Sequence, residues 1–423
     1  MIKITSVRNV DSFLASITSK TSKNNKKAVE SIIYDVQKNG DGAVRKYEKK
    51  FTNATLTTLR VSKNEIKDAY SRISKEQLDA IKTVKTRLYK TESVLKKRLE
   101  EITITIDGIK IKKNFIPISS VGCYVPGGLA NYPSTAIMSI VPAKVAGVKR
   151  IVVVSPPNKN GKVDPLTLVA ADICDADEIY KTGGAQAIAA LCFGTKSISK
   201  VDKIVGPGGI FVTMAKSIIS ERTSIDMVAG PTELAIIADA SADPNMVAKD
   251  LISQAEHSTD TCCYVITTSQ SFAKKVRDAV EQDMRRIKRK EIVKQSLVTN
   301  GFIAVCKSNN DVIKLINSIA PEHLEIITKN PQGLAAKIKT AGLILIGKNT
   351  PSSASDYLLG SNHILPTSGF GKARGSLSVL DFMKLNTQIE SSKNSLQHIS
   401  KYMKALTSAE NLPNHYEAVR SRL

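Results

Sequence analysis

From Val121 onward, short runs of apolar residues alternate with longer stretches in which apolar residues recur at helical spacing. Ile151–Val154 is one such run; Pro156 follows it closely, and a helical pattern begins at Leu166. Short apolar runs that are bounded by turn residues are typical of strands buried on both faces. Strands that alternate with helices form right-handed βαβ units in parallel sheets. The sequence therefore predicts an α/β protein with parallel sheets.

The expected strands are numerous enough for more than one sheet. They are Ile151–Val154, Glu178–Tyr180, Lys203–Val205, Leu234–Ala238, Cys263–Thr267, Phe302–Val305, Leu324–Ile327 and Leu343–Ile346. Helices are expected between them at Leu166–Ile173, Ala185–Leu191, Phe211–Ile219, Asn245–His257, Phe272–Arg285 and Asp311–Ile319. A chain of 423 residues also exceeds the usual size of one hydrophobic core. We therefore expect two Rossmann-like units.

The two ends of the chain have a different pattern. Residues 26–100 carry apolar side chains at three- and four-residue spacing, which predicts helices. The apolar segments Ile102–Ile106 and Ile109–Ile111 flank an Asp-Gly pair, which is typical of a tight hairpin turn. Beyond Arg374 no strand pattern remains, and Leu377–Leu423 is expected to be a small helical tail.

The net charge of +22 raises the question of an acidic partner such as nucleic acid. The basic residues are spread singly or in short groups among acidic ones and are not interleaved with aromatic residues, so platforms for stacking bases are missing. We expect no nucleic-acid partner. The six cysteines form no CxxC pair, which suits a reducing compartment. No apolar run is long enough for a signal peptide or a membrane span, and we expect a cytoplasmic protein.

Gln254 and His257 stand three residues apart at the end of an expected helix, so that an amide oxygen and an imidazole share one face. A pair at this spacing is more often an ordinary hydrogen-bonded contact, and a metal site needs further ligands from elsewhere. Asp356 lies in a loop of small residues, His363 follows it, and His415 lies in the helical tail. A mixed set of Gln, His, Asp and His would suit zinc with open positions for a substrate.

Glu322 and His323 are adjacent where an expected strand begins. A carboxyl group beside an imidazole suits acid–base chemistry because burial tunes each pKa, although such a pair also occurs at ordinary strand starts. Glycine-rich segments beside strand or helix starts allow the backbone to approach a ligand's phosphates. None has the spacing of the dinucleotide fingerprint, and each also fits a simple turn. They are Gly122–Gly128, Gly183–Gln186 and Gly206–Gly209.

Taken together, these segments resemble the histidinol dehydrogenases. The resemblance covers roughly the last three-quarters of the chain, from about Val121 to His415, and the matching stretches stand in the same order. They read GCYVPGG, IMSIVPAKVAGVK, GGAQAIAALCFGT, VDKIVGPGG, DMVAGPTE, SQAEH, PEHL, SASDY, GSNHILPT and AENLPNHYEAV. No single stretch is decisive, but their shared order is a specific signal.

The resemblance implies a role for each of the candidate residues. One zinc ion per subunit would be held by Gln254, His257, Asp356 and His415, the last supplied by the other subunit of a domain-swapped homodimer with a shared active site. Glu322 and His323 would be the catalytic acid–base pair. The substrate-binding set would be Thr232, Gln254, His257, His323, Asp356, His363, Glu410 and His415. The NAD-binding set would be Tyr124, Gln186 and Gly209.

The resemblance further implies a zinc-dependent oxidation of L-histidinol to L-histidine through L-histidinaldehyde, with two NAD molecules, as the last step of histidine biosynthesis. Two positions depart from the family pattern. Gly209 stands where the family usually has Asn, which removes any side-chain hydrogen bond to NAD from that position. Thr232 replaces the usual serine and keeps its hydroxyl group.

The implied fold is aldehyde-dehydrogenase-like, with two Rossmann-like domains and small helical N- and C-terminal domains. We expect an N-terminal arm at 1–25 and a first Rossmann-like domain, with the zinc and catalytic residues, at 26–123 and 233–376. The second Rossmann-like domain, on the NAD side, would span 124–232, and the swapped helical domain 377–423. The alternatives left open are a zinc-dependent hydrolase, a dehydrogenase of another amino alcohol and a basic nucleic-acid-binding protein.

Overall fold

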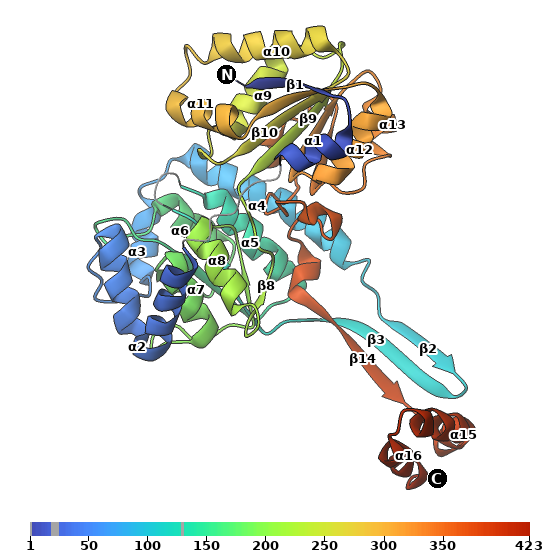
Figure 1. The fold of residues 1–423 in the computed structure, drawn as a ribbon. Coiled ribbons are helices and arrows are strands. Elements are labelled where there is room, and N and C mark those ends of the chain that lie inside the picture. The colour runs from blue at the N-terminus through green and yellow to red at the C-terminus, as the bar shows by residue number, and fades with distance from the viewer. Residues whose placement is uncertain (1, 18–24, 128–130) are drawn as a thin grey trace.

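The computed structural model describes residues 2–17, 25–127 and 131–423. Two parallel sheets are flanked by helices, and a third, antiparallel sheet forms a ribbon that projects from the rest of the chain (Figure 1). The α/β fold with parallel sheets predicted from the sequence is thus confirmed. Within these described ranges no helix is long and apolar enough to cross a membrane.

Sheet A has six strands, all paired in parallel, in the order β1-β11-β10-β9-β12-β13. The strands are β1 (Lys3–Val7), β9 (Glu233–Ala238), β10 (Cys262–Thr267), β11 (Phe302–Cys306), β12 (His323–Ile327) and β13 (Leu343–Ile346). Two apolar cores cover the sheet. One contains residues of α9 (Pro244–Ala255), α10 (Gln270–Asp283) and α11 (Lys290–Thr299), and the other contains residues of α1 (Val10–Ile17), α12 (Asn309–Ile319) and α13 (Pro331–Ala335). The short helix α14 (Ser352–Ser355) follows β13.

Sheet B has five parallel strands in the order β6-β5-β4-β7-β8. The strands are β4 (Ser120–Tyr124), β5 (Arg150–Ser155), β6 (Glu178–Lys181), β7 (Lys203–Val205) and β8 (Ser224–Ile225). The helices of this unit are α5 (Pro133–Ala146), α6 (Pro165–Ile173), α7 (Gly184–Phe193) and α8 (Ile210–Ile219). Helix α7 and strand β4 are almost wholly buried, which is why their sequences are continuous in apolar and small residues.

The two parallel sheets share one strand order. In sheet B the strands lie in the order third, second, first, fourth, fifth along the chain. Sheet A repeats this order in β11-β10-β9-β12-β13, and β1 is added beside β11. In such sheets the chain reverses direction between the first and fourth strands, and ligands bind at the carboxyl ends of these strands. The two reversal points therefore lie between β4 and β7 and between β9 and β12.

The N-terminal helices pack on the unit of sheet B. They are α2 (Lys26–Thr52), α3 (Lys63–Tyr70) and α4 (Lys75–Lys96), of which α2 contacts α7 and α8, α3 contacts α6, and α4 contacts α5 and α6. Ser62 and Ser74 start α3 and α4 with capping boxes. From the sequence, residues 26–123 were grouped with 233–376. Because their helices contact sheet B's helices, we propose instead that they belong to the same unit as 124–232.

A ribbon of β14-β3-β2 carries the C-terminal tail away from both parallel sheets (Figure 1). β2 (Ile102–Ile106) and β3 (Ile109–Pro117) form the predicted hairpin around Asp107-Gly108, both of which have positive φ. The expectation that no strand follows Arg374 is wrong. After the 3-10 turns η1 (Phe370–Lys372) and η2 (Val379–Phe382), β14 (Met383–Glu390) pairs with β3, and only then come α15 (Lys393–Ala409) and α16 (Pro413–Arg420). β14 is largely exposed, so its polar residues hid its strand character.

Candidate active site

A cavity of about 410 Å³ lies between the two parallel-sheet units. Its walls come from the loops after β4 and β7 in sheet B and from the amino ends of β9 and β12 in sheet A. Of the twelve residues expected at the site, eight line this cavity: Gly209, Thr232, Gln254, His257, Glu322, His323, Asp356 and His363. The structure thus brings together side chains from segments that are far apart in the sequence.

His323 is the first residue of β12 and is buried, with only 2% of its surface exposed. Its Nδ1 lies 3.3 Å from the carbonyl oxygen of Glu233, a contact that places the ring proton on Nδ1. Nε2 then carries the free lone pair; it makes no hydrogen bond in the structure and lies 3.4 Å from Oδ1 of Asp356. Burial lowers the pKa of His323, but the neighbouring Glu322 and Asp356 carboxylates outweigh it and raise the pKa to about 9. At neutral pH this favours the protonated ring, and once Nε2 has lost its proton the ring is a strong base aimed at the cavity.

The side-chain carboxyl groups of Glu322 and Glu233 each accept a hydrogen bond from the backbone amide of the other residue. The Glu233 amide donates to Oε2 of Glu322 at 2.8 Å, and the Glu322 amide donates to Oε2 of Glu233 at 3.3 Å. Oε1 of Glu233 also accepts from the Ser368 amide at 3.0 Å. Burial raises the pKa of Glu322 to about 8 and that of Glu233 to about 7. Glu233 thus holds the peptide that joins Pro321 to Glu322, directly before the pair Glu322–His323.

Gln254, His257 and Asp356 meet on one side of the cavity. Gln254 closes the last turn of α9, His257 follows that helix, and Asp356 follows α14. The Gln254 side chain is buried; its Oε1 accepts from the Ser352 hydroxyl at 3.2 Å, and its Nε2 has no hydrogen-bond partner. Desolvation lowers the pKa of His257. Burial raises the pKa of Asp356, but the His323 ring outweighs this effect and holds it below the usual value.

These three side chains are donors that zinc accepts: a neutral imidazole, an ionised carboxylate and an amide oxygen with a second lone pair. They do not complete a site in one chain. Among residues 2–17, 25–127 and 131–423, no group of three or more His, Cys, Asp and Glu side chains has a metal-binding arrangement. At least one more ligand is therefore needed to complete the expected set of four protein ligands.

His363 lies beside these residues. Its Nδ1 is 2.7 Å from the backbone oxygen of Asp356, and its Nε2 is 3.3 Å from the Thr135 hydroxyl. Desolvation lowers the pKa of His363, which favours a neutral ring. A neutral ring of this kind can donate or accept one hydrogen bond at the wall of the cavity without bringing in a charge.

The loop Gly206–Gly209 between β7 and α8 closes the cavity on the side of sheet B. Gly206 has a φ of +113°, and a Cβ atom there would collide with the Tyr124 carbonyl, so only glycine fits. The buried ion pair of Lys216 and Asp226 fixes this loop: the Gly206 amide donates to Asp226 at 2.8 Å, and Lys216 donates to the Gly206 carbonyl at 2.9 Å. Gly209 precedes α8 without a side-chain cap, and the space around it is open. The free backbone amides of the first turn suit an anionic group.

Tyr124 and Gln186, expected at the cofactor, do not line the cavity. The Tyr124 hydroxyl accepts from the Gly184 amide at 3.0 Å. The Gln186 side chain donates at 2.8 Å to Oε1 of Glu48, a buried carboxylate that also accepts from Thr182 and Gly183. In the structure both side chains therefore fix the loop that enters α7.

Glu410 and His415 are not brought to the cavity within one chain. Both are exposed, at the end of α15 and in α16, beyond the far end of the ribbon (Figure 1). His398, which was given no role, is also exposed on α15. If Glu410 and His415 serve this site, they must serve it in another copy of the chain.

Two buried carboxyl groups were missed by sequence reasoning. Glu233 follows Thr232 inside the stretch DMVAGPTE, and a charged residue at the start of an otherwise apolar strand was a usable signal. Glu48 lies in α2 among apolar positions, but nothing in the sequence connects it with Gly183 or Gln186, more than 130 residues away. Its role depends on the packing of α2 on α7.

The chain is similar in sequence and in structure to known histidinol dehydrogenases. A sequence profile described as histidinol dehydrogenase matches residues 16–423. Histidinol dehydrogenase of Methanococcus maripaludis is 44% identical over 395 residues, which cover 93% of this chain and 92% of that protein. That of Oceanobacillus iheyensis is 43% identical over 391 residues, which cover 92% and 91%. The crystal structure of histidinol dehydrogenase from Elizabethkingia anophelis superposes with a TM-score of 0.94 at 34% identity and covers 100% of this chain and 98% of that one.

Proposed function

Since this chain belongs to the histidinol dehydrogenase family and is an oxidoreductase of histidine biosynthesis, we propose that it oxidises L-histidinol to L-histidine. The oxidation would pass through L-histidinaldehyde and remove two electrons at each of two stages. The observation that carries this proposal is the buried pair Glu322–His323, whose free imidazole nitrogen faces a cavity also lined by Gln254, His257 and Asp356. Such a cavity offers a base, a second carboxyl group and a set of metal ligands to one small substrate.

His323 would act as the base in both oxidations. Its Nε2 takes the hydroxyl proton of histidinol while hydride leaves the same carbon, which gives the aldehyde. As water adds to the aldehyde, the protonated ring gives this proton to the carbonyl oxygen and is free again. The same nitrogen then takes a hydroxyl proton of the hydrate as the second hydride leaves, which gives the carboxylic acid, and the acid loses its proton to solvent. The raised pKa of His323 makes it a strong acceptor for both protons.

Glu322 would activate the water that adds to the aldehyde. Its carboxylate accepts a proton from water as the oxygen attacks the carbonyl carbon, and the raised pKa of Glu322 makes it a stronger base than an exposed carboxylate. A thiol nucleophile is not needed. In the described part of the chain no cysteine lines the cavity, and burial raises the pKa of Cys123, which lies behind it, far above its usual value.

Gln254, His257 and Asp356 would hold one zinc ion, with His415 of a second copy as the fourth ligand. When bound, zinc would supply an electrophilic anchor for the imidazole and amine of histidinol and so orient its carbinol group. Thr232, His363 and Glu410, the last again from the second copy, would contact the substrate. The neutral imidazole of His257 and the ionised Asp356 are already in the protonation states that ligands need.

NAD would bind at the reversal point of sheet B. The Gly206–Gly209 loop and the uncapped start of α8 offer backbone amides to its phosphates, and Gly209 would contact it directly. NAD supplies the acceptor for the hydride. Tyr124 and Gln186 would act through the Gly183–Gly184 turn that they hold, or contact NAD where it extends past that turn.

We also propose a homodimer whose subunits exchange their C-terminal tails. The ribbon and tail expose a set of large apolar side chains that one copy leaves uncovered: Ile102, Ile104, Ile106, Leu385, Ile389, Tyr402, Leu406 and Leu412. An exposed apolar surface on a projecting segment favours burial against a second copy. The same exchange would deliver Glu410 and His415 to the partner's cavity. A cytoplasmic location agrees with the six cysteines, which are all free.

Turnover of histidinol tests the proposal directly. The purified protein with zinc, NAD and L-histidinol should form two NADH per histidinol consumed, and L-histidine should be the product. A chelator should abolish NADH formation, and added zinc should restore it. Oxidation of other amino alcohols in preference to histidinol would contradict the substrate assignment. Hydrolysis of an ester or amide without NADH formation would contradict the whole proposal.

Glu233→Gln should lower kcat about tenfold and leave the KM for histidinol nearly unchanged. The amide has one acceptor oxygen, whereas Glu233 uses two to accept from Ser368 and Glu322. The loss of the hydrogen bond from the Glu322 amide costs about 1–2 kcal/mol and loosens the backbone at Glu322, next to His323. Steady-state kinetics that separate kcat from KM check this result. Glu221→Gln, an exposed change of the same chemistry, is the control, and an unchanged kcat in Glu233→Gln would rule out the bracing role.

A further inference from the structure

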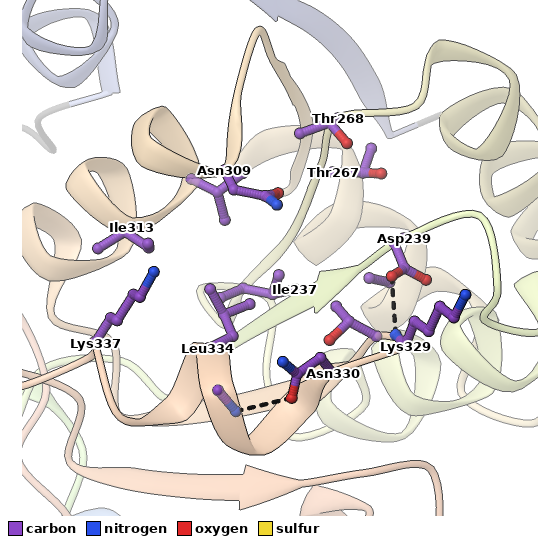
Figure 2. Close-up of a pocket in the computed structure, with 14 residues that line it drawn as sticks. Ile237, Asp239, Thr267, Thr268, Asn309, Ile313, Lys329, Asn330, Leu334 and Lys337 are labelled. Atoms are coloured by element: carbon purple, nitrogen blue, oxygen red, sulfur yellow. Dashed lines mark hydrogen bonds between the residues drawn. The ribbon is translucent and has the colours of Figure 1, made fainter.

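A second hollow, of about 310 Å³, lies at the opposite end of sheet A from the active site (Figure 2). It is bounded by the carboxyl ends of β9, β10 and β12 and by residues of α12 and α13. Glu233, beside the active site, begins β9, and Asp239, beside the hollow, directly follows it, about 20 Å away along the strand. The proposed reaction uses none of the residues of this hollow.

The position of this hollow in the fold favours a ligand. Both parallel sheets have the same strand order, and the reversal point of sheet B, between β4 and β7, opens into the active-site cavity. The equivalent point of sheet A lies between β9 and β12, and the hollow is found there. Crevices at such points are the common ligand sites of open parallel sheets. A volume of 310 Å³ is also in the range of small-molecule sites.

The walls of the hollow combine an apolar side with groups that bind hydroxyls and an anion. Ile237, Ile313 and Leu334 form apolar surface, and Thr267, Thr268, Asn309, Thr328 and Asn330 offer hydroxyl and amide groups. Burial opposes ionisation of Asp239, but hydrogen bonds from Ser241 and from the Lys329 amide outweigh it and hold the pKa of Asp239 below its usual value. An ionised carboxylate with a free lone pair is a good acceptor for sugar hydroxyls.

One side of the hollow, the side with Lys337, suits the anionic group of a ligand. The turn after β9 carries Asp239 and Asp243 and no glycine-rich loop, so a phosphate group is disfavoured there. The start of α12 is also occupied, because Ser308 caps it and Asp311 lies in its first turn. Lys337 is free: its ammonium group has no hydrogen bond or ion pair to any described residue, and Figure 2 shows its side chain reaching toward Ile313 at the edge of the hollow.

We propose that this hollow binds a phosphate monoester of a sugar, with sugar hydroxyls on Asp239 and the phosphate on Lys337. A nucleoside monophosphate and a simple sugar phosphate share this chemistry. The apolar side formed by Ile237, Ile313 and Leu334 would accommodate a base in the first case and would stay unused in the second.

Equilibrium binding to the intact protein tests the proposal, with AMP, ribose 5-phosphate and inorganic phosphate as separate probes. NAD is kept saturating, because AMP resembles half of NAD and could fill the active site. AMP, ribose 5-phosphate or both should bind more tightly than inorganic phosphate. Lys337→Glu should weaken that binding roughly tenfold or more, since it removes a charge-assisted hydrogen bond. Lys337→Arg should keep most of it.

Lys339→Glu is the matched control, because Lys339 is exposed nearby, carries the same charge and does not line the hollow. It should leave binding unchanged. An equal loss in Lys339→Glu would mean that only the general positive charge attracts the probes, and it would overturn the proposal. No binding of either sugar phosphate, or inorganic phosphate binding as tightly, would overturn it too. AMP tighter than ribose 5-phosphate identifies a nucleotide site, and equal binding identifies a sugar-phosphate site. Neither result depends on whether histidinol is the substrate.

Discussion

His323→Gln is expected to lower kcat for NADH formation from histidinol by roughly 10³-fold, within the range of about 10² to 10⁴ typical of a lost general base. Glutamine has a similar volume and can still donate from its amide toward the Glu233 carbonyl, but it cannot accept a proton at the position of Nε2. Steady-state NADH absorbance with histidinol and NAD measures the effect. The zinc content of the purified protein should stay at the wild-type value, because His323 is not among the proposed ligands.

His398→Gln is the matched control, since His398 is an exposed histidine on α15 without an assigned role. It should retain the wild-type kcat. Far-UV circular dichroism and a thermal melt establish that both variants fold, which matters because His323 is buried as the first residue of β12. If folded His323→Gln with a normal zinc content kept more than about a tenth of the wild-type kcat, another group would have to be the base.

The parallel-sheet regions were the most predictable part of the fold. Strands such as Ile151–Val154 and Leu234–Ala238 lie in the middle of covered sheets, so nearly every position is apolar and the run stands out. Not every edge strand did: β6 and β13 were predicted, but β1, β8 and β14 were not. β1 and β8 are edge strands, and β14 is one edge of an exposed ribbon, where only pairing with β3 maintains the extended conformation. The apolar pattern of these three strands is too weak to identify them as strands from the sequence alone.

The candidate site was predictable where chemistry is local in the chain. Glu322 and His323 are neighbours, and Gln254 and His257 share one helix end, so residue type and spacing were sufficient to mark them. Their convergence with Asp356 and His363 came from the resemblance to a family, because no spacing rule connects segments that meet only through the fold. Glu233 shows the same limit. Its importance comes from two contacts: its carboxylate accepts from the Glu322 amide, and its carbonyl oxygen contacts the His323 ring, at the start of a neighbouring strand 90 residues later.

Tyr124 and Gln186 were predicted at the cofactor, and in the structure their side chains also make local contacts within the protein. Both lie at the carboxyl edge of sheet B, as a cofactor contact should. The Tyr124 hydroxyl, however, accepts from Gly184, and the Gln186 amide nitrogen donates to the buried Glu48, while Oε1 of Gln186 has no hydrogen-bond partner. A buried polar group needs a partner, and the protein itself provides one for the Tyr124 hydroxyl and for the Gln186 amide nitrogen. From the sequence, Glu48 could not be identified as that partner, because α2 is far from α7 along the chain.

Mixing two inactive variants is expected to restore about a quarter of the wild-type activity if the tails are exchanged in a dimer. His323→Gln lacks the base but has an intact tail, whereas His415→Ala has an intact cavity but lacks the proposed fourth zinc ligand. Random reassociation makes about half of the dimers mixed. In each mixed dimer one cavity combines an intact His323 with the partner's intact His415 and the other has both defects, so about half of the sites in half of the dimers are competent.

We expect mixing to restore activity because of the position of the C-terminal tail. The ribbon carries α15 and α16 away from the cavity of their own chain, and the exposed apolar residues of β2, β14 and α15 have no cover within that chain (Figure 1). Mixing His323→Gln with Glu322→Gln is the control: both defects lie in the same cavity, so no mixed dimer has a complete site and activity should stay at background. If His415→Ala alone is inactive and mixing it with His323→Gln restores nothing, although mass measurements show mixed dimers, then His415 serves its own chain and the tail must fold back. If the protein is monomeric at the concentration of the assay, the exchange is excluded and the fourth zinc ligand has to be found within one chain.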